Sequence, residues 1–313
     1  MKVVITGGAG FIGTNLALHF NEVTPDVDVV LVDDYSNSAP QNTEGIRAEV
    51  VEASVLDTEA MRRAFSAASS IVHLGALGSV PRSVVDPRAT HDANATGTLN
   101  VLQVARDLDI EHVVVSSSSS VYGSNLALPK SESDWTHPLS PYAVSKLATE
   151  AYTYAFANTY GMKTLPFRLF NVYGPRQSAR HVYAAVVPML IERILDGRPL
   201  EIHGDGEQSR DFTYVATVCA TVHDAVMRRV SSSTPVNLAF GTNTTINQVV
   251  GELEAIAGRR FPVEHVGPRK GDVRASMADG RLVRELFPAV EPIPLAEGLA
   301  ATWGWFAGEV SAT

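Results

Sequence analysis

The sequence has a single cysteine, Cys219, so an internal disulfide is impossible and a cysteine-based metal site has no support. Its nine histidines show neither the His-x-x-x-His pairing nor the cysteine-histidine spacing of metal ligands, and we expect no metal ion. No apolar run reaches the ~18 residues of a membrane span. A strand pattern that begins at Lys2 leaves no room for a signal peptide. These absences predict a cytoplasmic protein without a membrane partner.

Basic side chains are few and scattered. Lysine and arginine number 25 against 34 aspartates and glutamates, and the net charge of -9 is spread over both halves of the chain. Without a basic cluster, nucleic acid is excluded as a partner. The 45% of hydrophobic residues and 19% of charged residues are typical of a globular protein. A chain of 313 residues buries a substantial core as one large domain or two modest ones.

The N-terminal stretch has the strand, glycine-rich turn and helix of a dinucleotide-binding fold. Apolar residues 2–6 run into Gly7-Gly8-Ala9-Gly10-Phe11-Ile12-Gly13, where glycines let the backbone approach a pyrophosphate at the start of a helix. A second apolar strand, residues 27–32, ends at Asp33, whose carboxylate suits the adenosine ribose and opposes a 2′-phosphate. Since no arginine follows in residues 34–37, NAD is favoured over NADP. A simple glycine turn in another α/β fold is the alternative.

Strand and helix patterns alternate regularly up to residue 170, which predicts an α/β fold with a doubly wound parallel sheet of the Rossmann type. Beyond residue 170 the alternation is lost. We expect residues 1–170 and about 213–243 to form an NAD-binding domain, and about 171–212 and 244–313 to form a smaller C-terminal α/β substrate domain. Further strands are expected at 48–51, 70–74, 112–116, 164–169, 200–203 and 236–240, and helices at 14–21, 57–65, 85–107, 142–160, 182–195, 245–257, 281–286 and 295–306.

Tyr142 and Lys146 stand four residues apart, after Ser140 and Pro141, which suit a helix N-cap and first turn. This spacing places both side chains on one helix face, where the lysine favours a phenolate. A phenolate populated at neutral pH needs a shift of about three pKa units, or roughly 4 kcal/mol, which exceeds what one lysine supplies. A second cation, such as an oxidised nicotinamide ring, would help. An amphipathic helix with a packed tyrosine and a solvated lysine is the alternative.

A serine run, residues 116–120, follows the carboxyl end of the strand at 112–116. Ligands bind at such strand ends in this architecture, although a flexible linker has a similar composition. With this run the motifs resemble, in order and over nearly the whole chain, the extended short-chain dehydrogenases of sugar-nucleotide metabolism, and among them the UDP-hexose 4-epimerases. The matching stretches are the glycine turn, Asp33, 117–123, 142–146, 168–175 and 204–212.

The resemblance implies that Tyr142 is the catalytic base, that Ser118 assists the proton transfer, and that Lys146 binds the ribose and lowers the pKa of Tyr142. NAD takes a hydride from C4 of the sugar and returns it to the other face, so the cofactor stays bound. The implied cofactor contacts are Gly7, Gly10, Phe11, Ile12, Gly13, Asp33, Asp34, Asn37, Ser54, Val55, Leu74, Gly75, Ala76, Asn94, Ser116, Tyr142 and Lys146.

The implied substrate is a UDP-sugar. Its contacts are Ser118, Tyr142, Asn171, Val187, His203, Arg210, Arg269, Asp272 and Ser276. Asn171 and the two arginines match positions that hold the diphosphate, for which guanidinium groups are suited, Asp272 matches a position at the ribose, and His203 lies where a ring stacks on the base. The chain departs from the family pattern at Ser54, where an aspartate often meets the adenine, at Gly75, a usual alanine, and at Gly78, a lysine in some members. The last change leaves nicotinamide-side binding to other groups.

The resemblance favours epimerisation over elimination of water. The 4,6-dehydratases carry an Asp-Glu pair where this chain has Ser119 and Ser120, and the decarboxylases usually keep the glutamate. A small Ser276, where a tyrosine restricts some members to plain hexoses, leaves room for an N-acetyl group. We therefore expect activity on the UDP-glucose/UDP-galactose pair and on the N-acetylated pair, UDP-GlcNAc/UDP-GalNAc. A UDP-glucuronate 4-epimerase, a dTDP-glucose 4,6-dehydratase and a non-catalytic NAD-binding regulator are the alternatives.

The family usually forms homodimers through two long helices, here 85–107 and 142–160. An apolar stripe suited to such an interface is expected from Leu147, Ala151, Tyr154 and Ala155. A monomer in which this stripe packs internally is the alternative.

Overall fold

A seven-stranded parallel sheet forms the centre of the molecule, which was obtained as a computed structural model that describes residues 1–179, 185–267 and 273–311. The strand order is β11-β6-β5-β4-β1-β2-β3, so the chain reverses its direction of progress across the sheet between β1 and β4. The strands are β1 (Lys2–Thr6), β2 (Asp28–Asp33), β3 (Glu49–Glu52), β4 (Ser70–His73), β5 (His112–Ser118), β6 (Lys163–Leu169) and β11 (Val236–Leu238). This topology confirms the predicted doubly wound Rossmann sheet.

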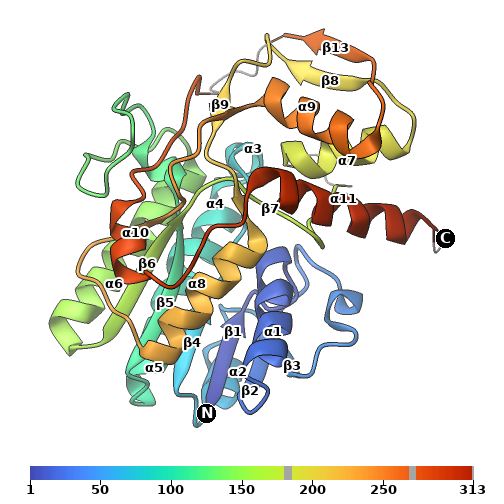
Figure 1. Cartoon of the computed structure of the whole chain (residues 1–313). Coiled ribbons are helices and arrows are strands. Elements are labelled where there is room, and N and C mark those ends of the chain that lie inside the picture. The colour runs from blue at the N-terminus through green and yellow to red at the C-terminus, as the bar shows by residue number, and fades with distance from the viewer. Residues whose placement is uncertain (180–184, 268–272, 312–313) are drawn as a thin grey trace.

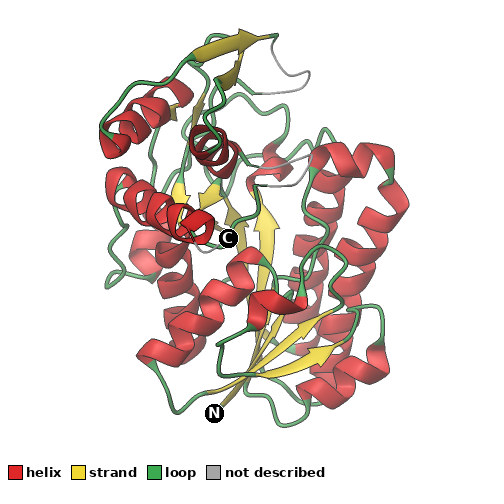
Figure 2. Ribbon diagram, turned by 90° about the vertical axis from the view of Figure 1, so that its right-hand side faces the viewer, coloured by secondary structure: helices red, strands yellow, loops and turns green. Residues whose placement is uncertain are grey.

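Helices cover both faces of the sheet because its strands alternate buried apolar side chains between two cores. Val3 and Ile5 of β1 pack with α1 (Phe11–Val23) and α8 (Val215–Arg228). Val4, between them in sequence, packs on the other face with α2 (Thr58–Phe65) and α5 (Gly97–Asp107). α6 (Pro141–Tyr160) lies beside α5 on this second face, and α10 (Arg281–Leu286) packs near β11. Figure 2 shows the sheet between these two helical layers.

The helix predicted over 85–107 is divided in the structure. It comprises α3 (Val80–Val85), α4 (Pro87–His91), a π-helical turn (Asp92–Thr96) and α5. Asp86 separates the first two and caps α4 by accepting a hydrogen bond from the Ala89 amide at 3.0 Å. Gly97 starts α5, and a Cβ there would lie 2.6 Å from the Val55 side chain. The glycine therefore serves helix packing.

Those parts of the second half of the chain that do not join the sheet or its helices build a smaller body over the carboxyl ends of the sheet (Figure 1). Its core lies among α7 (Val186–Leu195), α9 (Ile246–Ala257) and α11 (Leu295–Ser311). Three two-stranded sheets accompany these helices. They pair β7 (Val172–Tyr173) with β10 (Thr213–Tyr214), β8 (Leu200–His203) with β13 (Val263–Val266), and β9 (Ser209–Arg210) with β12 (Thr244–Thr245). Short 3-10 helices lie at Pro40–Thr43 and Ser119–Tyr122.

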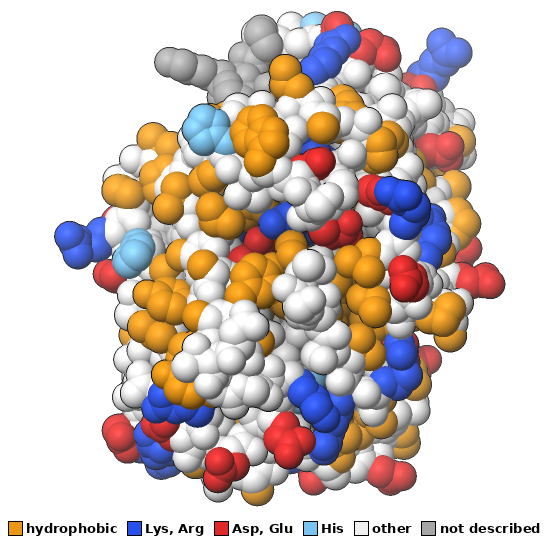
Figure 3. Space-filling view, turned by 90° about the vertical axis from the view of Figure 1, so that its left-hand side faces the viewer, with side chains coloured by type: hydrophobic (Ala, Val, Ile, Leu, Met, Phe, Trp, Pro, Cys, Tyr) orange, Lys and Arg blue, Asp and Glu red, His pale blue; other side chains and the backbone are white. Residues whose placement is uncertain are grey.

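The strand expected at 236–240 does return to the main sheet, beside β6, but it ends at Leu238. β13 was not predicted, and the described part of the helix expected at 182–195 begins at Val186. The exact division into two domains remains a prediction. Acidic and basic side chains are interspersed on the face drawn in Figure 3, with hydrophobic patches across its middle. In the part of the chain that the structure describes, no helix has both the length and the apolar character needed to cross a membrane.

Candidate active site

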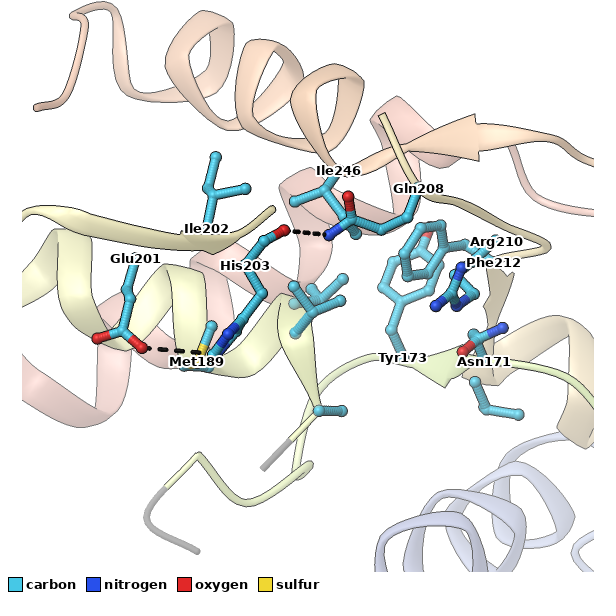
Figure 4. A pocket seen from close by; sticks show the side chains of 14 residues that line it. Asn171, Tyr173, Met189, Glu201, Ile202, His203, Gln208, Arg210, Phe212 and Ile246 are labelled. Carbon is cyan, nitrogen blue, oxygen red and sulfur yellow. Dashed lines mark hydrogen bonds and ion pairs between the residues drawn. The ribbon is translucent and has the colours of Figure 1, made fainter. Parts of the chain in front are cut away.

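Three adjoining pockets follow one another along the carboxyl ends of the sheet. The Asp33 pocket, of about 400 Å³, lies over β1 and β2 and shares Gly7, Gly10 and Ala76 with the next pocket. The second pocket, which we call the Tyr142 pocket, has a volume of about 650 Å³ and shares residues 171, 172 and 185 with the third. The third, the Arg210 pocket of about 220 Å³, lies in the smaller body (Figure 4). The three form a continuous groove that has room for two ligands meeting in its middle.

The glycine-rich turn forms the wall between the first two pockets, and its shape requires glycine. Gly7 has a φ of +70°, and a Cβ there would lie 2.7 Å from the Gly75 nitrogen. A Cβ on Gly13 would lie 2.3 Å from the Gly7 carbonyl oxygen. The turn is therefore an open backbone cradle at the N-terminus of α1, the site at which a phosphate group is favoured.

Asp33 is held rigidly at the end of β2. Its Oδ2 accepts a hydrogen bond from the Ala9 amide at 2.9 Å, and its Oδ1 accepts bonds from the Tyr35 amide at 3.0 Å and the Ser38 hydroxyl at 2.7 Å. Other predicted cofactor contacts line the same pocket, namely Asp34, Asn37, Ser54, Val55, Leu74, Gly75 and Ala76. Phe11, Ile12 and Ser116 line the Tyr142 pocket. A cradle for phosphate beside a fixed carboxylate fits a dinucleotide.

Asn94 is the predicted contact that lies behind the pocket wall. Its buried side chain exchanges hydrogen bonds with the backbone of Leu77, at 2.7 Å and 3.2 Å, and donates another to the Ser145 hydroxyl at 2.9 Å. It therefore ties the π-helical turn and the pocket wall to the helix that contains Tyr142.

α6 begins as the sequence predicts and presents Tyr142 and Lys146 to the Tyr142 pocket. The Ser140 hydroxyl caps it by accepting a bond from the Ala143 amide at 3.1 Å, with Pro141 at the first position. Lys146 is 5% exposed and donates a hydrogen bond to the Ser116 carbonyl at 2.9 Å. The structure thus joins the two motif residues to the end of β5.

Ser118 lies at the same strand end, within hydrogen-bonding reach of the Tyr142 phenol. Its oxygen accepts two hydrogen bonds from Ser120, at 3.2 Å from the amide and 2.9 Å from the hydroxyl. Because both donors occupy its lone pairs, the single proton of Ser118 is directed elsewhere, toward Tyr142.

The ionisation of these groups is governed by their removal from water. Burial raises the pKa of Tyr142 above its ordinary value, and the bond with Ser118 opposes this only in part. Burial also lowers the pKa of Lys146 to about 8, against the favourable charge of Glu150. The lowering of the Tyr142 pKa that we expected from Lys146 is therefore not found in the chain alone. The phenol stays protonated until a further positive charge is bound beside it.

Two buried groups that the sequence analysis did not identify support this centre. Glu150, one turn after Lys146, pairs with Arg168 of β6 at 2.8 Å and accepts a 2.5 Å bond from Ser117. His73, at the end of β4, contacts Thr6 at 2.7 Å and Thr98 at 3.1 Å. The spacing of Glu150 from Lys146 was a usable signal, since residues four apart share a helix face.

Four of the predicted substrate residues meet in the Arg210 pocket. Arg210 and Asn171 lie together at one end, and His203 lies at the other with Glu201 (Figure 4). Val187, on α7, contributes a buried apolar wall. The amide of Ser276 donates a 3.1 Å bond to the Ser209 carbonyl, which places Ser276 next to the strand that bears Arg210. Arg269 and Asp272 lie outside the described residues.

Several lining residues were not among the predicted contacts. Tyr173, Gln208 and Phe212 line the Arg210 pocket, and Arg82 and Arg176 line the Tyr142 pocket. Pocket lining depends on tertiary packing, and an isolated arginine in a sequence is indistinguishable from a surface charge.

Known proteins share both this sequence pattern and this structure. Residues 3–239 match the NAD dependent epimerase/dehydratase family. A UDP-glucose 4-epimerase of Mycolicibacterium smegmatis is 33% identical over 98% of each chain. Among solved structures, a UDP-N-acetylglucosamine 4-epimerase from Methanobrevibacter ruminantium M1 has 32% identity and a TM-score of 0.92 over 98% of each chain. A UDP-glucose 4-epimerase from Thermotoga maritima has 34% identity and a TM-score of 0.91 over 99% of this chain and 100% of its own.

The matched span covers the glycine turn, Asp33, Ser118, Tyr142 and Lys146, and the structural likeness extends through the smaller body. The chain therefore belongs to the NAD dependent epimerase/dehydratase family.

Proposed function

We propose that this protein is an NAD-dependent 4-epimerase of UDP-hexoses, active on the UDP-glucose/UDP-galactose pair and on the UDP-GlcNAc/UDP-GalNAc pair. The observation that carries the proposal is the position of the Ser118–Tyr142 pair, in the pocket that joins a dinucleotide cradle to an arginine-bearing pocket. Similar proteins known as UDP-glucose and UDP-N-acetylglucosamine 4-epimerases support it.

The residues that hold the cofactor in this proposal are those of the first two pockets. Asp33 accepts hydrogen bonds from the adenosine ribose, the glycine turn and the start of α1 receive the pyrophosphate, and Lys146 contacts the second ribose. When bound, NAD supplies the hydride acceptor and donor for C4 of the sugar.

Tyr142 is the general base and acid of the proposed reaction. Its oxygen takes the proton of the 4-hydroxyl group as that carbon is oxidised, and returns it after the sugar has turned over in the pocket. Ser118, with its proton directed toward Tyr142, holds the phenol and the sugar hydroxyl in line. Since burial keeps the phenol protonated in the chain alone, the base forms only when the positively charged site is assembled.

Ser119 and Ser120 separate this proposal from elimination of water. Dehydration requires an acid and a base near C5 and C6, and serine hydroxyls do not ionise at neutral pH. Ser120 is moreover engaged with Ser118. The side chain of Ser276 sets the sugar range in our proposal: Ser276→Tyr abolishes only the activity on N-acetylated substrates, and an equal loss on both substrate pairs would contradict this role.

Proton NMR of the purified protein tests the proposal, with UDP-GlcNAc, UDP-galactose and UDP-glucuronate in separate tubes and no added cofactor. We expect the C4 epimer in the first two tubes, and its loss in Tyr142→Phe. Conversion of UDP-glucuronate alone would instead assign a uronic-acid epimerase. A new C6 methyl signal would assign a 4,6-dehydratase, and unchanged turnover in Tyr142→Phe would remove Tyr142 as the base.

We also propose a homodimer formed through α3, α4 and α6, which pack side by side. Val84, Val85 and Val144 are 67%, 78% and 52% exposed, which is unusual for so many neighbouring apolar side chains. Of the stripe expected on α6, Ala151 and Ala155 are exposed, whereas Leu147 packs internally and Tyr154 is half-buried.

A further inference from the structure

The charged residues of the groove are divided between its pockets. The titratable side chains that line the Asp33 pocket are all acidic, namely Asp33, Asp34 and Asp92. Those that line the Tyr142 pocket, apart from Tyr142 itself, are all basic, namely Arg82, Lys146 and Arg176. The glycine turn belongs to both pockets, so the change of sign occurs where the backbone cradle for phosphate lies. An anion at the turn is repelled from one side and attracted from the other.

Lys146 is engaged at the end of β5, where it donates to the Ser116 carbonyl. Gly78 also lines the Tyr142 pocket and offers no charge to it. Arg82 lies four residues further on, in α3, and its guanidinium donates a 2.8 Å hydrogen bond to the Asn37 side chain. It thus extends from one wall of the Tyr142 pocket to the loop after β2.

Arg176 reaches the same loop from the opposite half of the chain. Its guanidinium donates a 3.1 Å bond to the Asn42 carbonyl, and the Asn42 side chain donates a 2.8 Å bond to the Ala9 carbonyl in the glycine turn. Asn15, in the second turn of α1, donates a 3.0 Å bond to the Pro175 carbonyl. Arg176 itself has a φ of +67°, a conformation that a non-glycine residue keeps only when its surroundings enforce it.

We propose that Arg82 and Arg176 form a two-arginine clamp on the pyrophosphate of the dinucleotide, and that this clamp retains the cofactor between turnovers. The inference rests on the proposed function, because it takes NAD as the ligand of the groove. Guanidinium groups bind phosphate oxygens through paired charge-assisted hydrogen bonds, which a backbone cradle alone does not provide. Their bonds to the 36–43 loop hold both arginines beside the turn.

The test uses the full-length protein stripped of cofactor, with binding measured by calorimetry for NAD, ADP-ribose and UDP. We expect Arg82→Gln and Arg176→Gln each to lower the affinity for NAD and for ADP-ribose by about tenfold, which is the effect of losing one charge-assisted hydrogen bond. In both variants we expect the affinity for UDP to stay within twofold of the wild-type value. Arg63→Gln, an exposed arginine on α2 outside these pockets, is the matched control and leaves all three affinities unchanged.

NAD content is the second readout. We expect wild-type protein and Arg63→Gln to keep their NAD through gel filtration in 0.5 M salt, where the Debye length is about 4 Å. The double variant Arg82→Gln/Arg176→Gln should lose its NAD under the same conditions. ADP-ribose binding within twofold of wild type in both single variants overturns the clamp. Weaker binding of NAD with unchanged binding of ADP-ribose would also overturn the clamp, because it would assign the arginines to the nicotinamide side. Weaker binding of UDP instead would overturn it by assigning them to the substrate. If wild-type protein binds neither NAD nor ADP-ribose, the proposed function itself fails.

Discussion

His73 shows how a single buried residue connects β1, beneath the glycine turn, to Thr98 of α5, which in turn contacts Thr149 of α6 at 3.2 Å. The Thr98 hydroxyl donates its proton to the Asn94 carbonyl at 2.5 Å, so its oxygen must accept from Nε2 of His73. Nδ1 then accepts from the Thr6 hydroxyl, whose oxygen in turn receives the Gly75 amide at 3.3 Å. The ring is required in its neutral form, and burial, aided by the charge of Lys146, lowers its pKa to about 3.

This arrangement predicts an acid-sensitive fold. The pKa of His73 is lower in the folded chain than the 6.5 of an unfolded one, so the folded state binds fewer protons between these values. Its contribution to stability is complete above pH 6.5 and is lost as the pH falls toward 3, by about 1.4 kcal/mol for each pH unit. Urea unfolding at pH 7, 6 and 5 measures it. His73→Gln should show a shallower decline than wild type, and equal slopes would contradict the assignment.

At the scale of secondary structure, the Glu150–Arg168 pair joins α6 to β6, and the bond from Ser117 to Glu150 adds β5, about two helical turns after Tyr142. Both side chains are almost fully buried, 1% and 4% exposed, and the Arg168 guanidinium also lies 4.6 Å from the centre of the Tyr122 ring. Glu150→Gln leaves a buried guanidinium without its counter-charge, and we expect a loss of about 3–5 kcal/mol in the free energy of unfolding.

A matched control is available on the surface. Asp224 and Arg228 form a pair at 2.5 Å on α8 with 26% and 47% exposure, so Asp224→Asn should cost no more than about 1 kcal/mol. Chemical denaturation of both variants at pH 7 measures the difference. A loss of similar size in the two variants would show that the Glu150 pair does not anchor the catalytic helix.

The elements that the sequence predicts well are those fixed by local chemistry. Ser140 and Pro141 start α6 as expected, and Asp33 ends β2 where a continuous apolar strand meets the loop. β13 was missed because Val263–Val266 becomes a strand only by pairing with β8, about sixty residues earlier in the chain. The π-helical turn depends on Asn94, whose partners lie on α6 and in the 74–77 segment.

The sequence predicted which residues form the candidate site better than it predicted their ionisation. Tyr142, Lys146 and Ser118 are brought together as expected, because strand ends and helix faces follow from periodicity. The upward direction of the Tyr142 pKa was not predicted, since it depends on burial by distant segments. Arg176 was missed for the same reason: only the folded chain places it beside the glycine turn.

At the scale of the whole molecule, the proposed dimer makes a direct prediction. Val85→Glu places a charge in the exposed apolar surface of α3 and α6, and burying that charge in an interface is unfavourable. We expect a dimer for wild-type protein and a monomer for Val85→Glu in analytical ultracentrifugation. Val23→Glu, at the end of α1 with 51% exposure, is the matched control and should remain dimeric. A monomeric wild type, or a dimeric Val85→Glu, would contradict the proposed interface.

The central claim is that one groove brings a dinucleotide and a UDP-sugar together at Tyr142, so that the C4 hydrogen is removed and returned without meeting water. Proton NMR of the conversion of UDP-galactose in D₂O, without added cofactor, tests this most directly. We predict that the epimer forms with a full-intensity proton signal at C4. Deuterium at C4 of the product would contradict the account, because it would show that this hydrogen exchanges with solvent during the reaction.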